Sequence, residues 1–236
     1  LRLSHGVLSG GDVGGAVDNS GMLTLSRCRL DGNRSGSSSP LGGGAIFNGV
    51  GASLLVDSST FDSNVSQRGA AIFNAGIAEL YNSTFSGNSS DNGANVSEGA
   101  IQNRGTLTAV HITVSNNNNP FSGSVGGLFA FNADTILINS IISGNSGVDC
   151  KITGGTSTSV ALLLGSASNC ASSSNGDPQL GALANNGGLT ATHTLGANSA
   201  ALDIGDPAFC LASDQRGMPR APLGTCDLGA LERLAV

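Results

Sequence analysis

The 236-residue chain has no tryptophan, one tyrosine and one lysine, and only 11% of its residues are charged. Lys and Arg together number 10, they form no basic cluster, and the net charge is −6. Proteins that bind nucleic acids neutralise phosphates with gathered Lys and Arg, so this composition argues against a nucleic-acid partner. The surface must consist mainly of Ser, Thr, Asn and Gly, which a helical globule would not favour.

Long apolar runs are also missing. The longest, around residues 160–164, is far too short to span a membrane. No run of helix formers is long enough for a crossover helix, whereas Gly accounts for 36 residues, about twice the usual share. The chain must therefore turn through strands and tight corners. It begins at Leu1 in the middle of an alternating pattern, which we interpret as a processed or truncated boundary.

One pattern recurs along the chain with variations. It opens as in Gly69-Ala70-Ala71-Ile72 and closes with a Phe-x-x-Asn ending such as Phe85–Asn88. The second residues of the openings, at intervals of 26 to 29, are Gly15, Gly44, Ala70, Gly99 and Gly127. Between opening and ending, apolar and polar residues alternate with a period of two, which predicts short strands. A repeat of this length built from strands and corners predicts a solenoid.

The predicted fold is all-β: a right-handed, single-stranded parallel β-helix whose equivalent positions stack about 4.8 Å apart. We assign residues 1–175 to its coils and 176–236 to a C-terminal cap continuous with the solenoid, because an open solenoid end needs a cover. The first predicted internal row is Val17, Ile46, Ile72, Ile101 and Phe129. The second is Leu30, Phe61, Phe85, Val114 and Ile142.

Stacking also predicts two asparagine ladders. An Asn side chain can bond its equivalents above and below and tolerates left-handed backbone, so we assign these residues to the scaffold. One ladder is Asn19, Asn48, Asn74 and Asn103, with Asn132 one residue out of register. The other is Asn33, Asn64, Asn88, Asn117 and Asn145.

Five cysteines are present. Cys28 stands at an inward position and is expected to be buried and free. Cys150 with Cys170, and Cys210 with Cys226, are candidate disulfides, although spacing alone does not fix the connectivity. If they form, the protein matures in an oxidising compartment.

No cofactor is predicted. The chain has no CxxC or HExxH spacing for zinc. Gly10-Gly11-Asp12-Val13-Gly14 resembles one copy of a calcium-binding nonapeptide, but a calcium site of that kind needs tandem copies.

Two resemblances to known families follow from these motifs. The openings and Phe-x-x-Asn endings over residues 14–145 resemble the repeats of chlamydial polymorphic outer membrane proteins. The tail resembles the closing segment of bacterial secreted β-helix proteins of the choice-of-anchor Q type, although Leu189 and Ala200 stand where that family has Pro. The motifs that carry this second resemblance are Asp177–Gly181, Leu183–Gly188, His193, Ala201–Gly205, Asp214–Gly217, Arg220 and Cys226–Glu232. It implies a protein that is secreted or on the bacterial cell surface, without a defined reaction.

Catalytic candidates are few. Many β-helices cleave polysaccharides, but fold alone does not assign an activity. A lyase needs a base and a cation on one face, for which Tyr81, His111 and Lys151 are the candidates, although Tyr81 and His111 differ by one position in their repeats. A hydrolase needs paired carboxylates. Asp31 and Asp62 share an offset and could hold calcium or share a proton, but a solvated pair is our default interpretation.

Asp214, Arg216, Arg220 and Asp227 are interpreted as an ion-pair network that fixes the cap, in preference to a catalytic site.

A binding strip is the non-enzymatic alternative. The position after each first-row residue is expected to point outward and carries Asp18, Phe47, Phe73, Gln102 and Ala130, with Phe131 alongside. Stacked exposed rings would suit a partner or a sugar. Equally, a projecting loop such as residues 35–42 could cover them.

We therefore predict a secreted or bacterial cell-surface adhesion or binding module that contacts a surface protein or polysaccharide through Phe47, Phe73, Gln102 and Phe131. The alternative is a carbohydrate-active β-helix enzyme, either a polysaccharide lyase or a glycoside hydrolase. The near-absence of Tyr and Trp weakens sugar stacking and favours a protein partner.

Overall fold

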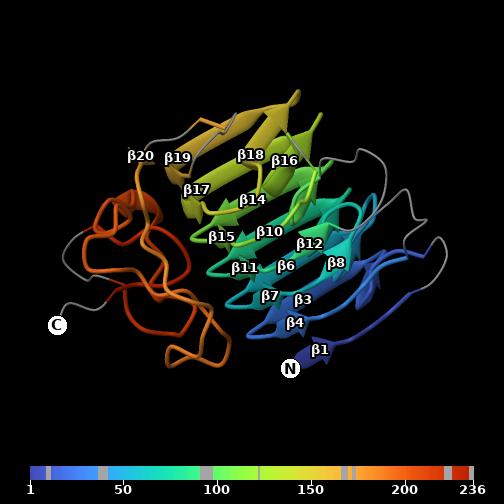
Figure 1. Ribbon diagram of the computed structural model, residues 1–236, viewed down its shortest axis with the longest axis horizontal. Coiled ribbons are helices and arrows are strands. Elements are labelled where there is room, and N and C mark those ends of the chain that lie inside the picture. The colour runs from blue at the N-terminus through green and yellow to red at the C-terminus, as the bar shows by residue number, and fades with distance from the viewer. Residues whose placement is uncertain are drawn as a thin grey trace.

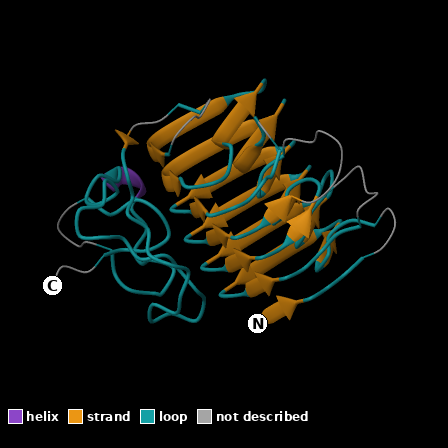
Figure 2. Cartoon of the chain, viewed as in Figure 1, coloured by secondary structure: helices purple, strands orange, loops and turns teal. Residues whose placement is uncertain are grey.

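The computed structural model describes residues 1–8, 12–36, 42–90, 98–121, 123–165, 170–171, 174–220 and 225–233. Within these ranges the chain forms a stack of short parallel strands, one 3₁₀ turn and no α-helix. Figures 1 and 2 show the strands piled coil upon coil, with the C-terminal segment looping beside the stack. The predicted parallel β-helix is confirmed.

Coils 1 to 4 each run through strands of three, five and three residues; coils 2 and 3 add a fourth strand of two. Coil 5 and the final coil use longer strands.

The coil before coil 1 supplies β1 (Arg2–Ser4). Coil 1 contains β2 (Val17–Asn19), β3 (Met22–Ser26) and β4 (Arg29–Asp31). Coil 2 contains β5 (Ile46–Asn48), β6 (Ser53–Asp57), β7 (Thr60–Asp62) and β8 (Val65–Ser66). Coil 3 contains β9 (Ile72–Asn74), β10 (Ile77–Tyr81), β11 (Thr84–Ser86) and β12 (Ser89–Ser90). Coil 4 contains β13 (Ile101–Asn103), β14 (Thr106–Val110) and β15 (Thr113–Ser115). The remaining strands are β16 (Val125–Phe131), β17 (Asp134–Ile142), β18 (Val148–Thr153), β19 (Ser157–Leu164) and β20 (Ser174–Asn175).

These strands pair in parallel with the strand one coil away. One sheet has the order β18-β16-β13-β9-β5-β2. A second ladder stacks β3, β6, β10 and β14, and a third stacks β1, β4, β7, β11 and β15. In the earlier coils a corner separates the second ladder from the third. β17 and β19 are long enough to continue both ladders, because each runs on through this corner.

The core lies inside the coils. The second predicted row is confirmed, because Leu30, Phe61, Phe85, Val114 and Ile142 pair in sequence and all are fully buried. The rings of Phe61 and Phe85 stack with centroids 4.9 Å apart. Burying a side chain of this size contributes roughly 1.5–3 kcal/mol.

The first predicted row is wrong at its last member. Ile101 pairs with Leu128, so Phe129 shifts outward by one position and lies beside Gln102. The register places Gly126, not Gly127, opposite Gly99, so this coil opens one residue earlier than we predicted.

Both asparagine ladders are confirmed. In the first, Nδ2 of each Asn donates to Oδ1 of the next over 2.7–2.8 Å. It ends where Asn103 donates to Thr135 Oγ1, and Asn132 is outside it as predicted. In the second ladder the same bonds measure 2.8–2.9 Å, and the last residue, Asn145, donates to Asp149 Oδ1. Each rung satisfies buried amides that would otherwise be costly to bury.

The corner between the second and third ladders contains a column of residues with left-handed backbone. Each coil places one non-glycine residue there, with φ between 43° and 53°: Arg27, Ser58, Asn82, His111, Asn139 and Ala161. Backbone N–H groups of these residues donate to the carbonyl of the residue just before this position in the next coil, as in Asn82 N to Val110 O and His111 N to Ile138 O. We call this set the corner column.

The C-terminal segment (residues 176–220 and 225–233) docks on the corner column and the third ladder. Asn82 donates to Ser213 O, Asn139 donates to Asp206 O, and the backbone N–H of Gly229 donates to Asn139 O. A small second core of Ile141, Leu163, Leu195, Ala201 and Leu228 seals the contact. These contacts run along the flank of the stack rather than across its end, so our expectation of an end cap is not what the structure shows.

Both candidate disulfides, Cys150–Cys170 and Cys210–Cys226, are present, and Cys28 is buried and free as predicted. Among the described residues, no helix is sufficiently long and apolar to cross a bilayer.

Candidate functional site

The predicted aromatic strip does not form as an exposed surface. Its true register is Asp18, Phe47, Phe73, Gln102, Phe129 and Lys151, in which Phe129 takes the place expected for Ala130. Phe73 and Gln102 are buried at 1% and 0% exposure, and Phe47 is half-buried. The Phe47 and Phe73 rings stack at 5.4 Å. Of the four predicted binding residues, Phe131 alone is exposed, with Arg104 over its ring.

An ion-pair cluster belongs to the same side of the solenoid. The Glu98 carboxylate bridges Arg68 at 3.0 Å and Arg104 at 3.1 Å. Because Glu98 is buried and paired with two arginines, we assign this cluster a structural role in holding neighbouring coils together.

The three catalytic candidates are not brought together. Tyr81 pairs with Val110 and lies on the outer side of the second ladder. His111 follows Val110 but is fully buried against the C-terminal segment. Lys151 is on the other sheet, with its Nζ 5.9 Å from the centre of the Phe129 ring. Burial and the nearby Glu79 raise the pKa of Tyr81, so its phenol remains protonated and is a poor base.

Asp31 and Asp62 stack as their shared offset predicted, but they are not a solvated pair. Both are buried, and arginines separate their charges: Arg2 binds Asp31, while Arg29 binds Asp62 through two hydrogen bonds of 2.8 and 2.9 Å. Arg2 holds the pKa of Asp31 below its usual value, chiefly through their hydrogen bond. Carboxylates already neutralised in this way are unsuited to calcium binding or proton sharing.

Three of the four charged tail residues that we assigned to an ion-pair network form ion pairs, and Glu232 joins them. Asp214 binds Arg216 at 2.7 Å, and the buried Arg220 pairs with Glu232 at 3.0 Å. Asp227 instead accepts the backbone N–H groups of Asp203 and Arg233. Arg220 also donates to Asn82 Oδ1, which ties the network to the corner column.

Within the described ranges, the C-terminal segment leaves the outer side of β3, β6, β10, β14, β17 and β19 largely open, and we call this surface the β3–β19 face. Its side chains form three columns across the coils. The first is Met22, Ser53, Ile77, Thr106 and Asp134; the second is Thr24, Leu55, Glu79, Thr108, Ile136 and Thr158; the third is Ser26, Asp57, Tyr81, Val110, Ile138 and Val160. Met22, Ile77 and Ile136 are exposed at 93%, 53% and 38%.

A cleft borders this face where the C-terminal segment overlaps it. The 3₁₀ turn η1 (Pro207–Phe209) and the residues after it form one wall, and the third column forms the other. The cleft has a volume of about 370 Å³ and is lined by Tyr81, Thr108, Val110, Ile138, Ala208, Phe209, Cys210 and Leu211. A second hollow of about 450 Å³ lies at Val160, Ile204 and Pro207. A third, of about 250 Å³, lies around Met22, Leu55 and Ile77.

Sequence reasoning missed this face. Period-two alternation marks its residues as outward, but it marks the outward residues of every ladder equally. Which ladder stays uncovered depends on where the C-terminal segment docks, and no local sequence pattern predicts that docking position.

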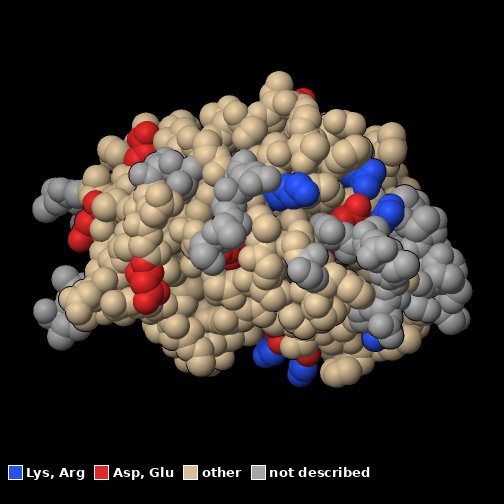
Figure 3. Space-filling view, turned by 45° about the horizontal axis from the view of Figure 1, so that its top comes forward, with Lys and Arg blue, Asp and Glu red and all other residues tan. Residues whose placement is uncertain are grey.

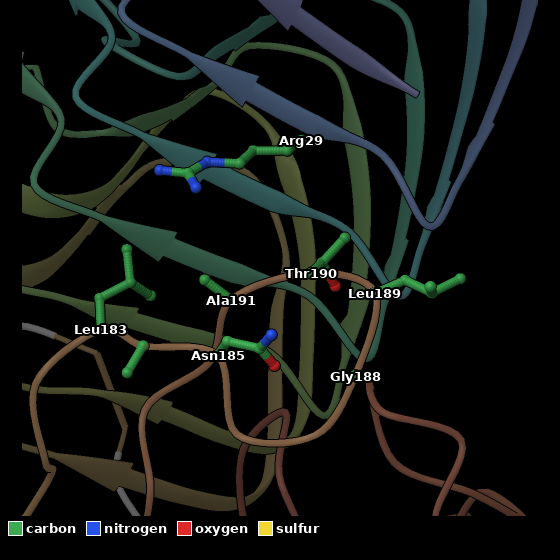
Figure 4. A pocket seen from close by; sticks show the side chains of 8 residues that line it. Arg29, Leu183, Asn185, Gly188, Leu189, Thr190 and Ala191 are labelled. Atoms are coloured by element: carbon green, nitrogen blue, oxygen red, sulfur yellow. The ribbon is translucent and has the colours of Figure 1, made fainter.

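A separate pocket of about 230 Å³ lies between coil 1 and the loop at residues 183–191. Figure 4 shows Arg29 on one side of it and Asn185, Thr190 and Leu189 along the loop. The guanidinium of Arg29 is already held by Asp62, so the pocket offers no free cation for an anionic ligand.

Ser86 and His193 have the contacts of a nucleophile and its base. His193 Nε2 lies 2.9 Å from Ser86 Oγ, and Nδ1 lies 2.7 Å from Gly181 O. Both residues are buried, at 4% and 2% exposure, beneath the C-terminal segment, so we interpret this contact as part of the docking. Burial lowers the pKa of His193 and keeps it neutral.

Charge is sparse on the outside of the molecule. Figure 3 shows one face, on which Lys, Arg, Asp and Glu form a few small groups on a mostly uncharged surface. The three columns of the β3–β19 face contain Asp57, Glu79 and Asp134 but no Lys, Arg or His. The face therefore cannot neutralise an acidic ligand.

No family model, curated protein or solved structure matches the chain. The resemblances drawn from its motifs therefore rest on those motifs alone.

Proposed function

We propose that the protein is a binding module whose β3–β19 face and adjoining cleft dock a protein partner. The observation that carries this proposal is the uncovered row of parallel strands in which Met22, Ile77 and Ile136 stay exposed, while the opposite aromatic row is largely buried. An exposed apolar surface of this kind marks interaction sites on soluble proteins.

Charge and shape support the choice of partner. Three carboxylates, Asp57, Glu79 and Asp134, stand among these apolar side chains without a cation in the columns. A partner with an apolar patch bordered by Lys or Arg complements this arrangement. Five strand steps make the face about 24 Å long. A polysaccharide fits less well, because Tyr81 is the only aromatic residue in the three columns and sugar stacking depends on such rings.

We further propose that the protein is secreted or carried on the bacterial cell surface, as its likeness to choice-of-anchor Q proteins implies. The two disulfides support an oxidising compartment.

A second candidate is a glycoside hydrolase. Asp57 and Glu79 are diagonal neighbours on adjacent strands of the open face, an arrangement in which two carboxylates can flank a glycosidic bond.

The test is a binding panel of immobilised extracellular-matrix proteins together with neutral and uronate polysaccharides. We expect saturable binding to a protein member, weakened at least tenfold by combining Met22→Ser, Ile77→Ser and Ile136→Ser. The control is Phe131→Ser, an exposed aromatic on another sheet, which should leave binding unchanged. Binding that resists the triple change would contradict the proposal. Sugar release that is lost in Asp57→Asn or Glu79→Gln would establish the hydrolase instead.

A further inference from the structure

Three metal-binding side chains converge beside the cleft. His111 follows β14, Cys210 follows η1, and Cys226 comes from the last stretch of the tail. One ligand atom from each lies within 4.8 Å of the other two. His111 and Cys226 are fully buried, whereas Cys210 lines the cleft and is half-buried. In the structure the two sulfurs are joined in a disulfide, so they cannot act as thiolate ligands.

The histidine is already oriented as a ligand. In the tautomer that carries its proton on Nδ1, this nitrogen donates to Gly229 O over 3.3 Å. The lone pair of Nε2 then faces Asn139 Nδ2 at 3.2 Å and Cys226 Sγ at 3.6 Å. An imidazole that donates its other N–H to a backbone carbonyl is typical of metal-bound histidines. Burial, aided by the charge of Arg220, lowers its pKa to about 3, so the ring is neutral.

The spacing suits zinc. With Zn–N bonds of about 2.0 Å and Zn–S bonds of about 2.3 Å at tetrahedral angles, a nitrogen and a sulfur on the same ion lie roughly 3.5 Å apart. The separation of His111 Nε2 from Cys226 Sγ is 3.6 Å. A site of thiolate and imidazole donors also binds zinc in preference to hard cations.

We propose that reduction of the Cys210–Cys226 disulfide converts this cluster into a Zn²⁺ site. A dithiol reductant supplies two electrons and two protons, the S–S bond breaks to give two thiols, and the dithiol is oxidised to a disulfide. With a phosphine, water supplies the two protons and the oxygen of the phosphine oxide that forms. The two thiols then lose their protons as they bind Zn²⁺, and His111 Nε2 is the third ligand. The fourth position faces the cleft that Cys210 lines, where a water completes the tetrahedron. This inference does not depend on the proposed binding function.

The surrounding charges permit a cation. Arg220 donates over 2.8 Å to the Gly229 carbonyl that faces His111, and its positive charge opposes a cation at this position. Its partner Glu232 lies 3.0 Å away and offsets it. Two thiolates would balance the charge of the zinc ion.

The disulfide and the proposed zinc site constrain the C-terminal segment differently. The disulfide joins two residues that both belong to the C-terminal segment. The zinc ion would join that segment to His111 of coil 4, across the docking interface. Zinc therefore replaces a link within the segment by a link between the segment and the solenoid.

The corner column supplies a matched variant. Asn82 and Asn139 occupy the positions equivalent to His111 in the coils below and above, and both hydrogen-bond to the C-terminal segment. His111→Asn therefore keeps a side chain that the corner accepts but removes the imidazole ligand.

The experiment titrates Co²⁺ into the full chain after anaerobic reduction with a phosphine. We expect one Co²⁺ per chain with the visible spectrum of a tetrahedral site and a thiolate-to-metal charge-transfer band, both lost when Zn²⁺ is added. Oxidised protein should give neither. His111→Asn should weaken Co²⁺ binding at least tenfold, while the double change Cys150→Ser with Cys170→Ser should leave it intact.

A melting measurement separates a site in the folded protein from metal bound by loose thiols. Zn²⁺ should raise the melting temperature of the reduced wild type and not that of reduced His111→Asn. Equal cobalt spectra in those two proteins, a reduced chain that does not melt cooperatively, or the absence of a tetrahedral spectrum would each overturn the proposal.

Discussion

Individual residues in this protein do different jobs at the same repeat position. In the corner column, Ser58, Asn82, His111 and Asn139 all adopt left-handed backbone, and all contact the C-terminal segment through main-chain or side-chain atoms. Asn at such a position needs no special account, because its short side chain tolerates positive φ. His111 is the exception, because keeping a buried imidazole neutral lowers the stability of the folded protein at acidic pH.

That cost predicts a pH dependence. The pKa of His111 is about 3 in the folded protein, against about 6.5 in the unfolded chain. Between these values the unfolded chain binds a proton that the folded chain does not, so folded stability falls as pH falls from about 6.5 toward 3. Relative to His111→Asn, the wild type should lose about 3 kcal/mol more unfolding free energy between pH 7 and pH 4.

Urea unfolding at the two pH values measures this difference. The shifts of His193, Asp149 and Asp227 are common to both proteins and cancel in the comparison. Equal losses in the two proteins would show that His111 does not stay neutral in the fold.

Among the elements, the strands were predictable and the C-terminal segment was not. Period-two alternation and recurrent Asn endings locate the coils, because every strand repeats the chemistry of its neighbours. The predicted register was wrong by one residue at Gly126-Gly127, because the sequence pattern allows either glycine to open the coil. The tail has no repeat, so its motifs suggested a cap but not that it lies along the flank. The buried state of Phe73 and Gln102 was one of two alternatives that alternation left open.

Gly229 tests how the segment is fastened. Its φ is +84°, and an added Cβ would lie 2.6 Å from Thr113 Oγ1 and 2.8 Å from Ile141 Cδ1. Gly229→Ala should therefore lift the segment off β15 and β17 and speed its digestion by thermolysin at least tenfold. The far-ultraviolet circular dichroism of the solenoid should not change.

Gly187→Ala is the control for backbone strain alone. Gly187 has a φ of +100°, but an added Cβ would meet no atom within 4 Å. It should cost on the order of 1 kcal/mol without releasing the segment. Equal digestion of the two variants would mean that the contact at Gly229 does not hold the tail.

At the scale of the whole molecule, the protein is a stack whose ends, core and flanks have separate roles. Two asparagine ladders and two apolar rows fix the coils. The C-terminal segment covers the flank formed by the third ladder, and the β3–β19 face stays open beside it. The rows followed from the repeat length, whereas the choice of open face depends on contacts between residues more than one hundred positions apart, such as Thr84 with Gln215.

The stacking itself is tested most directly by distances between spin labels on one column. Thr24, Ile136 and Thr158 share the middle column of the β3–β19 face. Labels on Thr24 and Ile136 span four strand steps, about 19 Å, and labels on Thr24 and Thr158 span five, about 24 Å. With Cys28 replaced by Ala, pulsed electron resonance should give two narrow distributions that differ by about one strand spacing. Broad distributions, or distances that do not grow with the number of coils, would contradict the account.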